Sequence, residues 1–299
     1  MRGRVPVRTI ALASVALVAA LVMSASASAA KRYRDPIFQD VKMRTDLVYG
    51  SAPVNGQPQE LKLDLYKPKG DRARKRPVLI WVHGGGFGSG DKAGGPAPLL
   101  ADYYAHRGYV TASINYRLLV PGGCIGTGTI PPECYSAAIE ATHDAQAAVR
   151  WFRANADKYR IDKKRIGIGG ESAGAITSCG VAALSANPGE SGNPGYDSAV
   201  GAFVSISGGL PGALFVDENT APGILFASLD DPLVPYQWSV DTYDKLASLG
   251  IPSQLTSFEG NVHVPFAEHG TEMETQTTSF VFKQLGLKDA KKDYARAGA

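Results

Sequence analysis

The sequence predicts an α/β fold with a mainly parallel central sheet that helices cover on both faces. The chain has 299 residues, of which 44% are hydrophobic and 20% charged, which is enough for one large domain with a buried core. From residue 78 onward, short apolar runs alternate with helical stretches. These runs are continuously apolar, as expected of strands that are buried on both sides. No internal repeat or long low-complexity linker divides the chain.

The order of the elements follows from these runs. Residues 61–66 alternate apolar and polar side chains, which predicts a half-buried strand that forms an antiparallel edge pair with its upstream neighbour. Buried strands are predicted at 78–82, 110–114, 165–169, 202–206, 224–228 and 254–258. Helices are predicted at 99–106, 137–156, 173–185, 236–249 and about 267–285. In such sheets ligands bind at the carboxyl ends of the strands, so we expect the functional residues to lie there.

The N-terminus has the features of a secretory signal peptide. It opens with three arginines, Arg2, Arg4 and Arg8. Residues 10–23 are almost wholly apolar, and small residues follow up to a cleavage site expected near Ala29 or Ala30. The alternative is a membrane anchor, but the apolar core is shorter than the ~20 residues that span a bilayer. We therefore expect a secreted protein without a stable membrane anchor, whose residues 31–299 form a single domain.

Charge and cysteine content narrow the class of partner. The chain has 31 basic and 28 acidic residues, and the first thirty residues hold three of the basic and none of the acidic ones. The remainder has 28 of each, so no nucleic-acid or anionic-membrane partner is expected. No Cys/His spacing resembles a zinc site, and we expect neither metal nor organic cofactor. The simplest pairing is a disulfide between Cys124 and Cys134 across a short loop, with Cys179 as a buried thiol.

The strongest local signal is Gly-Glu-Ser-Ala-Gly at 170–174. It follows the predicted strand 165–169 and opens a helix of small residues, which is the context of a nucleophile elbow. The glycines allow a strained turn that projects Ser172 into the site, and the helix N-terminus places N–H groups near developing negative charge. The alternative is an ordinary glycine-rich turn. We expect Ser172 to be a catalytic nucleophile.

A second signal is His-Gly-Gly-Gly-Phe at 83–87, directly after the strand 78–82. Consecutive glycines can turn backbone amides toward a tetrahedral oxyanion, and we expect Gly85, Gly86 and Ala173 to supply the N–H groups. The alternatives are a flexible turn or a phosphate loop, but the Gly-Lys-Ser/Thr ending of a phosphate loop is absent. We expect His83 to organise this loop rather than to act as the base.

The catalytic base and acid are sought on later loops. Of the five histidines, His263 follows the strand 254–258 in a loop at the expected end of the sheet. His269 should lie inside the last helix, on the surface. The acid should lie between the serine and the histidine, and the turn after 224–228 offers Asp230 and Asp231. We favour Asp231, which fits a D-x-x-V-P turn, and Asp230 remains the alternative.

Other polar and aromatic residues receive structural interpretations. Arg117 is expected to form a salt bridge at a strand end, and Asp144 to anchor its helix by hydrogen bonds. Glu171, beside the nucleophile, is expected to be a buried hydrogen-bond acceptor. Trp238 fits equally the core or a pocket wall.

Taken together, these motifs resemble those of the bacterial carboxylesterases of the α/β-hydrolase superfamily, in its type-B carboxylesterase and hormone-sensitive-lipase-like branches. The resemblance covers roughly residues 46–285. It is carried by Val-His-Gly-Gly-Gly-Phe at 82–87, Asn-Tyr-Arg at 115–117, Ala-Val-Arg-Trp at 148–151, the stretch 162–168 and the serine motif at 170–174. It implies an α/β-hydrolase fold, the triad Ser172, Asp231 and His263, and an oxyanion hole at Gly85, Gly86 and Ala173.

The chain departs from this family pattern at two places. Glu171 stands where the hormone-sensitive-lipase branch usually has Asp, and the long helical N-terminal cap of that branch is missing. The stretch 206–224 is too short for a large lid. We therefore expect a minimal cap or none, and an open, shallow site shaped by the loop 118–135.

The expected activity is carboxylic-ester hydrolysis through an acyl-enzyme on Ser172, acting on a small-molecule or polymeric ester. The alternatives are a peptidase, since the same triad cleaves amides, and a non-catalytic ligand-binding module on a hydrolase scaffold. The sequence leaves open the acyl and alcohol groups and the oligomeric state.

Overall fold

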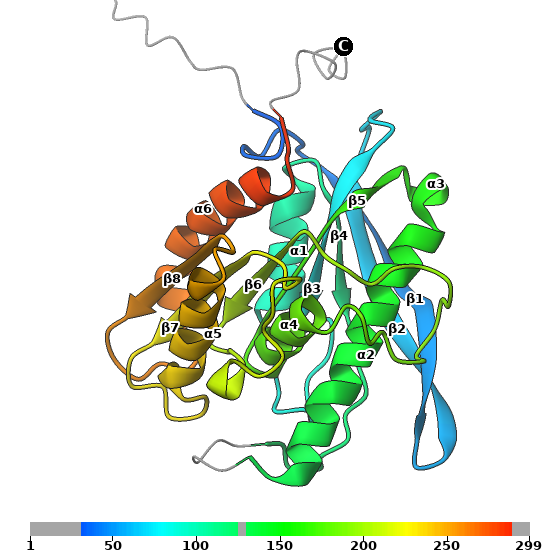
Figure 1. The fold of residues 1–299 in the computed structure, drawn as a ribbon. Coiled ribbons are helices and arrows are strands. Elements are labelled where there is room, and N and C mark those ends of the chain that lie inside the picture. The colour runs from blue at the N-terminus through cyan, green and yellow to red at the C-terminus, as the bar shows by residue number, and fades with distance from the viewer. Residues whose placement is uncertain (1–30, 125–129, 289–299) are drawn as a thin grey trace, which may run out of the picture.

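The computed structural model describes residues 31–124 and 130–288. The predicted signal peptide, residues 1–30, lies outside these residues. Within the described ranges the chain forms one eight-stranded sheet in the order β1-β2-β4-β3-β5-β6-β7-β8 (Figure 1). The strands are β1 (Val41–Val54), β2 (Gln57–Pro68), β3 (Arg76–Val82), β4 (Val110–Ile114), β5 (Ile161–Glu171), β6 (Ala202–Ile206), β7 (Gly223–Ser228) and β8 (Ser253–Phe258).

The expected antiparallel edge pair is confirmed. β1 pairs antiparallel with β2, β2 pairs antiparallel with β4, and the strands from β4 to β8 pair in parallel. The β1–β2 hairpin turns at Asn55 and Gly56, whose φ angles of 51° and 76° suit the two-residue turn that matches strand twist. The α/β-hydrolase architecture is therefore as the motifs implied.

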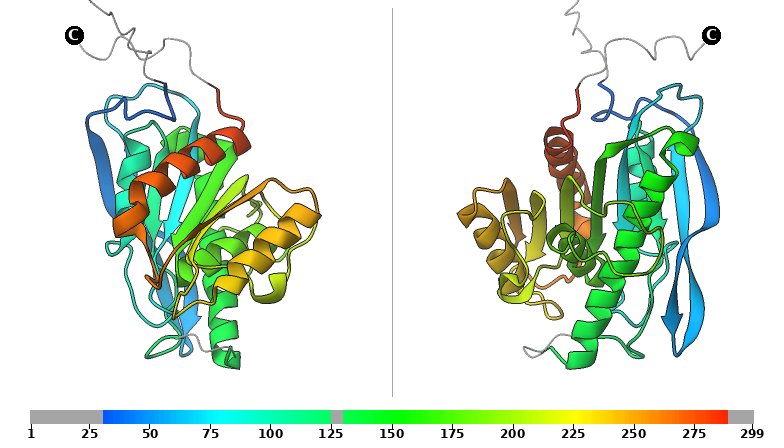
Figure 2. Two further views of the ribbon diagram at one scale, coloured as in Figure 1. Left: turned by 90° about the vertical axis from the view of Figure 1, so that its left-hand side faces the viewer. Right: turned by 45° about the vertical axis from the view of Figure 1, so that its right-hand side comes forward.

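Helices cover both faces of the sheet (Figures 1 and 2). They are α1 (Pro96–Ala105), α2 (Pro132–Ala154), α3 (Ala156–Tyr159), α4 (Ala173–Ala183), α5 (Tyr236–Ser248) and α6 (Phe266–Gln284), with the short 3-10 helix η1 (Pro211–Ala213) after β6. The buried residues of α1 and α6 share one apolar cluster, whereas those of α2, α4 and α5 share the other. None of the helices in the described ranges is long and apolar enough to cross a membrane.

The alternation of side chains in β3 explains why the sheet needs both layers. Val78, Ile80 and Val82 belong to the cluster with α2 and α4, and Leu79 and Trp81 belong to the cluster with α1 and α6. Successive residues of a strand point to opposite faces, so a continuously apolar strand requires cover on both.

Several predicted boundaries differ from the structure by a few residues, as β5 and α2 illustrate. β5 extends from Ile161 to Glu171, beyond the predicted 165–169, because its first residues also pair with β3. The helix predicted at 137–156 begins at Pro132, because proline is well suited to the first helical position, and it ends at Ala154.

Candidate active site

Ser172 occupies a strained turn between β5 and α4. Its φ and ψ angles are 55° and −121°, and its N–H donates to the carbonyl of Ile206 on the neighbouring strand β6 at 2.9 Å. The flanking glycines are needed for space. A Cβ at Gly174 would lie 2.1 Å from the carbonyl oxygen of Val82, and one at Gly170 would lie 2.5 Å from the Gly174 backbone. Any side chain there would collide with backbone, which is why the motif has glycine at both positions.

The structure brings Ser172, His263 and Asp231 together in one hydrogen-bonded chain. Oγ of Ser172 lies 2.8 Å from Nε2 of His263, and Nδ1 of His263 lies 2.9 and 2.7 Å from the two carboxylate oxygens of Asp231. Because a carboxylate can only accept, Nδ1–H donates to it, and Nε2 faces the hydroxyl as an acceptor. The Asp231 side chain is fully buried.

Hydrogen bonds hold the two loops that carry Asp231 and His263. The Oδ1 atom of Asp231 accepts the N–H groups of Leu233 and Val234 at 2.8 and 3.0 Å. Oγ of Ser228 donates to the carbonyl of Val262 at 2.6 Å, which joins the end of β7 to the histidine loop. Asp230 is exposed and contributes only its backbone, whose N–H donates to Gly260 in the described part of the chain. Of the two candidate aspartates, it is Asp231 that lies beside His263.

The glycine loop after β3 lies beside Ser172. Gly85 and Gly86 have φ angles of 111° and 60°, which favour glycine. The carbonyl of Gly86 accepts the N–H of Cys124 at 2.7 Å, so the loop is fastened to the segment that follows β4. Gly86 and Ala173 line the same cavity as Ser172. Gly85, which precedes Gly86 in the chain, is not among the lining residues.

His83 lies buried beneath this loop. Its Nδ1–H donates to the carbonyl of Gly84 at 2.7 Å, and its ring stacks on Tyr116 with centroids 4.5 Å apart. Burial lowers the pKa of His83, so the ring stays neutral and packs as an aromatic group. Its location agrees with the organising role expected of it.

Glu171 connects the glycine loop to the serine turn. Its Oε1 atom accepts the N–H of Gly84 at 2.9 Å, which confirms the expected buried acceptor. Burial is the main cause that raises its pKa to about 7, and the Gly84 hydrogen bond opposes that rise. The side chain therefore lies near the balance point between its neutral and charged forms at neutral pH.

A mainly apolar cavity opens beside Ser172. Its walls come from α2, α4, the η1 segment and the start of α5, and they include Tyr135, Ala138, Ile176, Leu210, Phe215 and Trp238. Trp238 is thus a wall residue. The loop 118–135 contributes Cys124, Ile130 and Tyr135 to the lining, as expected, and the short 206–224 stretch contributes Leu210 and Phe215. Most of these wall residues were missed, since no local motif marks them.

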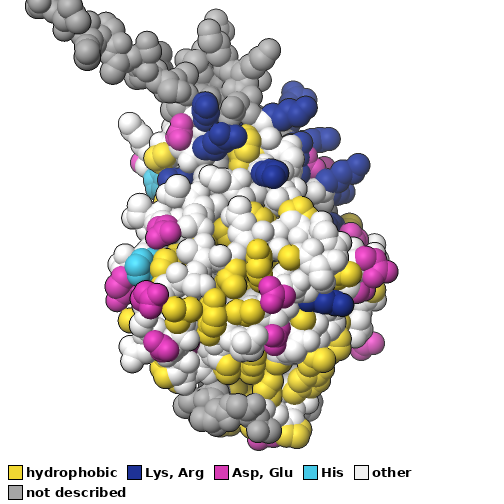
Figure 3. Space-filling view, turned by 60° about the vertical axis from the view of Figure 1, so that its left-hand side comes forward, with side chains coloured by type: hydrophobic (Ala, Val, Ile, Leu, Met, Phe, Trp, Pro, Cys, Tyr) yellow, Lys and Arg dark blue, Asp and Glu magenta, His cyan; other side chains and the backbone are white. Residues whose placement is uncertain are grey.

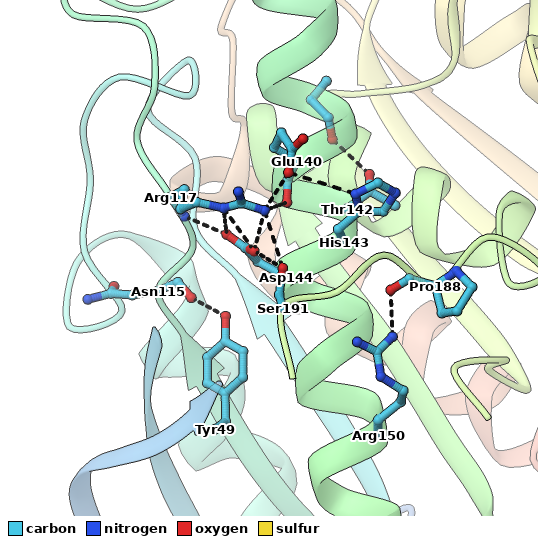
Figure 4. Close-up of polar contacts among 11 residues, drawn as sticks. Tyr49, Asn115, Arg117, Glu140, Thr142, His143, Asp144, Arg150, Pro188 and Ser191 are labelled. Carbon is cyan, nitrogen blue, oxygen red and sulfur yellow. Dashed lines mark hydrogen bonds and ion pairs between the residues drawn. The ribbon is translucent and has the colours of Figure 1, made fainter. Parts of the chain in front are cut away.

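A buried ion-pair cluster fixes α2, one wall of this cavity (Figure 4). Nε and Nη2 of Arg117 donate to the carboxylate of Asp144 at 2.8–3.1 Å, and Oγ of Ser191 donates to the same carboxylate at 2.6 Å. Glu140, one turn earlier on α2, also pairs with Nη2 of Arg117. The predicted roles of Arg117 and Asp144 are confirmed, and together they join α2 to the chain after β4.

The disulfide lies at the rim of the cavity. Cys124 and Cys134 are bonded, with Cα atoms 5.7 Å apart, and both line the cavity. Cys179 is a buried free thiol in α4, and burial raises its pKa to about 12. The bond connects the first turn of α2 to the residue that hydrogen-bonds Gly86. Both parts of the predicted cysteine pattern are present in the structure.

His269 departs from expectation. It lies in α6, as predicted, but it is half-buried rather than on the surface, because its ring stacks on Phe258 with centroids 4.1 Å apart. Among residues 31–124 and 130–288, no group of three or more His, Cys, Asp or Glu side chains is arranged to hold a metal ion.

Parts of this chain are similar in sequence to known proteins. The family model BD-FAE matches residues 63–207, a range that includes the glycine loop and the serine turn. Gut esterase 1 of Caenorhabditis elegans is 33% identical over 118 residues, which are 39% of this chain and 20% of that protein. The probable isoprenylcysteine alpha-carbonyl methylesterase ICMEL1 of Arabidopsis thaliana is 25% identical over 264 residues, 74% of this chain and 51% of that protein. The chain thus spans between a fifth and about half of these relatives.

Solved structures share most of this fold. The thermophilic esterase Est2 of Thermogutta terrifontis superposes with a TM-score of 0.64 at 20% identity, covering 82% of this chain and 91% of that one. A bifunctional GH43-CE protein of Bacteroides eggerthii superposes with a TM-score of 0.65 at 21% identity, covering 82% of this chain and 35% of that one. In its fold and its serine turn this chain is similar to esterases of the α/β-hydrolase fold, and residues 63–207 match the BD-FAE family.

Proposed function

We propose that this protein is a serine esterase that hydrolyses carboxylic esters through an acyl-enzyme on Ser172. The observation that carries the proposal is the unbroken hydrogen-bond chain from Asp231 through His263 to Ser172, beside an apolar cavity. No other described feature gathers a nucleophile, a base and a carboxylate in this order. The relationship to esterases supports the same chemistry.

The steps follow from the geometry. Oγ of Ser172 attacks the ester carbonyl carbon while its proton moves to Nε2 of His263, and the carbonyl oxygen becomes an oxyanion. The N–H groups of Gly86 and Ala173, with that of Gly85, are proposed to stabilise this charge. His263 then gives its proton to the leaving alkoxide, and the acyl group stays on Ser172. A water molecule, deprotonated by His263, releases the acid and restores the hydroxyl.

The carboxylate of Asp231 has a positioning role in these steps. It holds one imidazole tautomer and stabilises the imidazolium that forms, without taking the proton. Its burial and its two backbone N–H donors keep it oriented toward His263. Est2 has been solved phosphorylated by paraoxon, and a reaction with the same type of reagent would show an activated serine in this chain.

The first test replaces the nucleophile. Ser172→Ala should lower ester hydrolysis by on the order of 10⁶, because the acyl-enzyme cannot form, while the thermal midpoint stays close to that of the wild type. A fluorophosphonate probe should label the wild type on Ser172 and leave the variant unlabelled. A variant that keeps a tenth of the wild-type rate would remove Ser172 from the mechanism. Failure of the wild type to react with the probe would favour the binding-module alternative, and cleavage of amides faster than esters would favour a peptidase.

We also propose that residues 1–30 direct export and are removed near Ala29 or Ala30. The order of basic, apolar and small residues supports this, and the Cys124–Cys134 bond suits an oxidising compartment. N-terminal sequencing of protein recovered from the medium of an expressing bacterial host should begin at residue 30 or 31. Recovery of the full chain only inside the cells would refute export.

A further inference from the structure

A second recess lies at the end of the sheet opposite Ser172. It opens at the amino ends of β3 and β5, beside the short helix α3 (Figure 1), and has a volume of about 330 Å³. The side chains come from β1, the end of β2 and the loop after it, β3, and the connection from α3 to β5, so the fold gathers their charges. We call this recess the basic cleft after its six cationic residues, Lys42, Lys67, Lys69, Arg76, Lys158 and Arg160.

Two lysines of the basic cleft stand directly opposite each other. Lys42 and Lys67 are register partners on the antiparallel strands β1 and β2, an arrangement in which like charges are destabilising. Neither side chain has an ion-pair partner among the described residues. Burial, together with nearby cations of which Arg76 acts most strongly, lowers the pKa of Lys67. A third lysine, Lys69, has only an exposed pair with Asp40 at 3.2 Å, and such pairs are weak.

The acidic side chain in the lining, Asp71, already has cationic partners. Arg32 donates to its two carboxylate oxygens at 3.0 and 2.6 Å, and Nη1 of Arg76 lies 3.6 Å from Oδ2. Arg76 exposes only 3% of its surface, and its Nε has no hydrogen-bond partner among the described residues. Because two guanidinium groups share this one carboxylate, the positive charge of the lysines and of Arg160 stays unbalanced within the protein.

We propose that the basic cleft binds a ligand that carries a diphosphate group. A carboxylate, with one negative charge, would leave most of the six cations unbalanced, whereas a diphosphate brings three or four. At about 30 Å³ for each water molecule the cleft holds roughly ten of them, so the seven oxygens of a diphosphate fill most of it. Lysine binds phosphate as a point charge, and arginine can donate two parallel N–H bonds to it. A soluble diphosphate and a lipid diphosphate headgroup offer the same chemistry.

The cleft is separate from the proposed ester-cleaving site. It opens at the start of β3, and Ser172 follows β5, which pairs in parallel with β3. The seven residues of β3 extend over roughly 20 Å. A diphosphate in the cleft therefore touches neither Ser172 nor its substrate, and its binding goes beyond the proposed function and does not depend on it.

The test is calorimetric titration of the purified protein with inorganic pyrophosphate, at an ionic strength kept constant with NaCl. We expect one saturable site that binds pyrophosphate at least about tenfold more tightly than orthophosphate, because more of the cations are neutralised. Lys67→Gln with Lys158→Gln should weaken the binding about tenfold, since two charge contacts are lost. Lys62→Gln with Lys245→Gln removes the same charge outside the cleft and should change the affinity by less than about twofold.

Equal weakening by the two pairs, or titrations without saturation, would show general charge attraction and overturn the cleft as a site. Thermal midpoints check that each double variant is folded. If the cleft pair melts early, the exposed Lys42 replaces it: Lys42→Gln should weaken binding about threefold, and an unchanged affinity would count against the proposal. Pyrophosphate should leave kcat/KM for an ester unchanged, and competitive inhibition would place the anion at Ser172 instead.

Sedimentation with vesicles distinguishes the two sources of the diphosphate. The vesicles are of phosphatidylcholine, with and without a minor fraction of diacylglycerol pyrophosphate. Binding to the diphosphate vesicles that free pyrophosphate reverses supports the site and identifies a lipid headgroup. Binding of pyrophosphate in solution without binding to these vesicles supports the site and identifies a soluble ligand. Vesicle binding that pyrophosphate does not reverse would assign the attraction to another surface and refute the proposal.

Discussion

At the scale of single residues, two buried carboxylates near Ser172 are held in different ways. Asp231 faces the imidazole of His263 and accepts two backbone N–H groups, so both of its carboxylate oxygens have hydrogen-bond partners. Glu171 accepts one N–H, from Gly84, and its other oxygen, Oε2, is buried without a hydrogen-bond partner among the described residues. The burial of Glu171 therefore favours its neutral acid form.

The pair of neighbouring aspartates gives a matched comparison. Asp231→Asn should lower kcat by more than ~10³, because an amide no longer holds the required imidazole tautomer. Asp230→Asn should lower it by less than about tenfold, since that side chain is exposed. Steady-state kinetics on one ester measures both. The reverse ranking would show that the other carboxylate serves His263.

Glu171 should give folding stability a distinct pH dependence. Its pKa is raised in the folded protein from 4.5 to about 7, so between these values the folded state holds a proton that the unfolded chain has lost. Stability from this group is therefore fully present below about pH 4.5 and falls as the pH rises toward 7, by roughly 3 kcal/mol at most. Denaturant unfolding of wild type and Glu171→Gln should show the variant gaining relative stability across this window. A difference that stays constant with pH would contradict the assignment.

The triad candidates could be predicted because each has a local signal. Ser172 stands in a glycine-flanked turn between β5 and α4. Asp231 follows the carboxyl end of β7, and His263 follows the carboxyl end of β8. The partial burial of His269 could not be predicted, because its ring stacks on Phe258, which belongs to a different element, β8.

At the scale of elements, the cavity depends on segments far apart in the sequence. The wall residues Ala138, Ile176 and Phe215 come together only when α2, α4 and the stretch after β6 pack against one another. The elements themselves could be predicted from periodicity, and so could the parallel sheet. The cavity between them could not, because it depends on how α2 packs against α4, where Thr142 lies beside Gly180.

The disulfide stabilises one end of this arrangement. Cys124 and Cys134 are ten positions apart, and closing a loop of this length should contribute about 2–3 kcal/mol to the free energy of unfolding. Replacing both with serine should lower the stability by that amount in denaturant titrations. Alkylation of the unreduced, unfolded wild type should label Cys179 alone, and all three cysteines should react after reduction. Labelling of three cysteines without reduction would show that the bond is absent.

At the scale of the whole molecule, the charges are unevenly distributed. A cleft at the amino ends of β3 and β5 is lined by six cationic side chains and one carboxylate: Lys42, Lys67, Lys69, Arg76, Lys158, Arg160 and Asp71. Partial burial and these neighbouring cations lower the pKa of Lys67. Figure 3 shows most of the Lys and Arg side chains of one face near the top of the molecule, and hydrophobic side chains below them. Residues 31–299 have no net charge by composition, and only the fold shows that basic side chains gather at one end of the molecule.

This separation should be measurable by ion exchange. At low ionic strength and pH 7 a protein of residues 31–299 should bind a cation exchanger despite its formal neutrality, and Lys67→Glu with Lys158→Glu should elute at clearly lower salt. Lys245→Glu with Lys62→Glu changes the net charge equally at positions outside the cleft and should shift elution less. Equal shifts for the two pairs would mean that net charge alone governs adsorption.

The basic cleft also determines which way an adsorbed molecule faces. It opens at the start of β3, whereas Ser172 lies beyond the carboxyl end of the adjacent β5, a strand length of roughly 20 Å away. A molecule held by this end on a negatively charged surface turns Ser172 toward the solution. Such a layer is oriented rather than random, so the adsorbed enzyme should keep most of its activity on small dissolved esters. Salt near 0.1 M, where the screening length is about 10 Å, should release it.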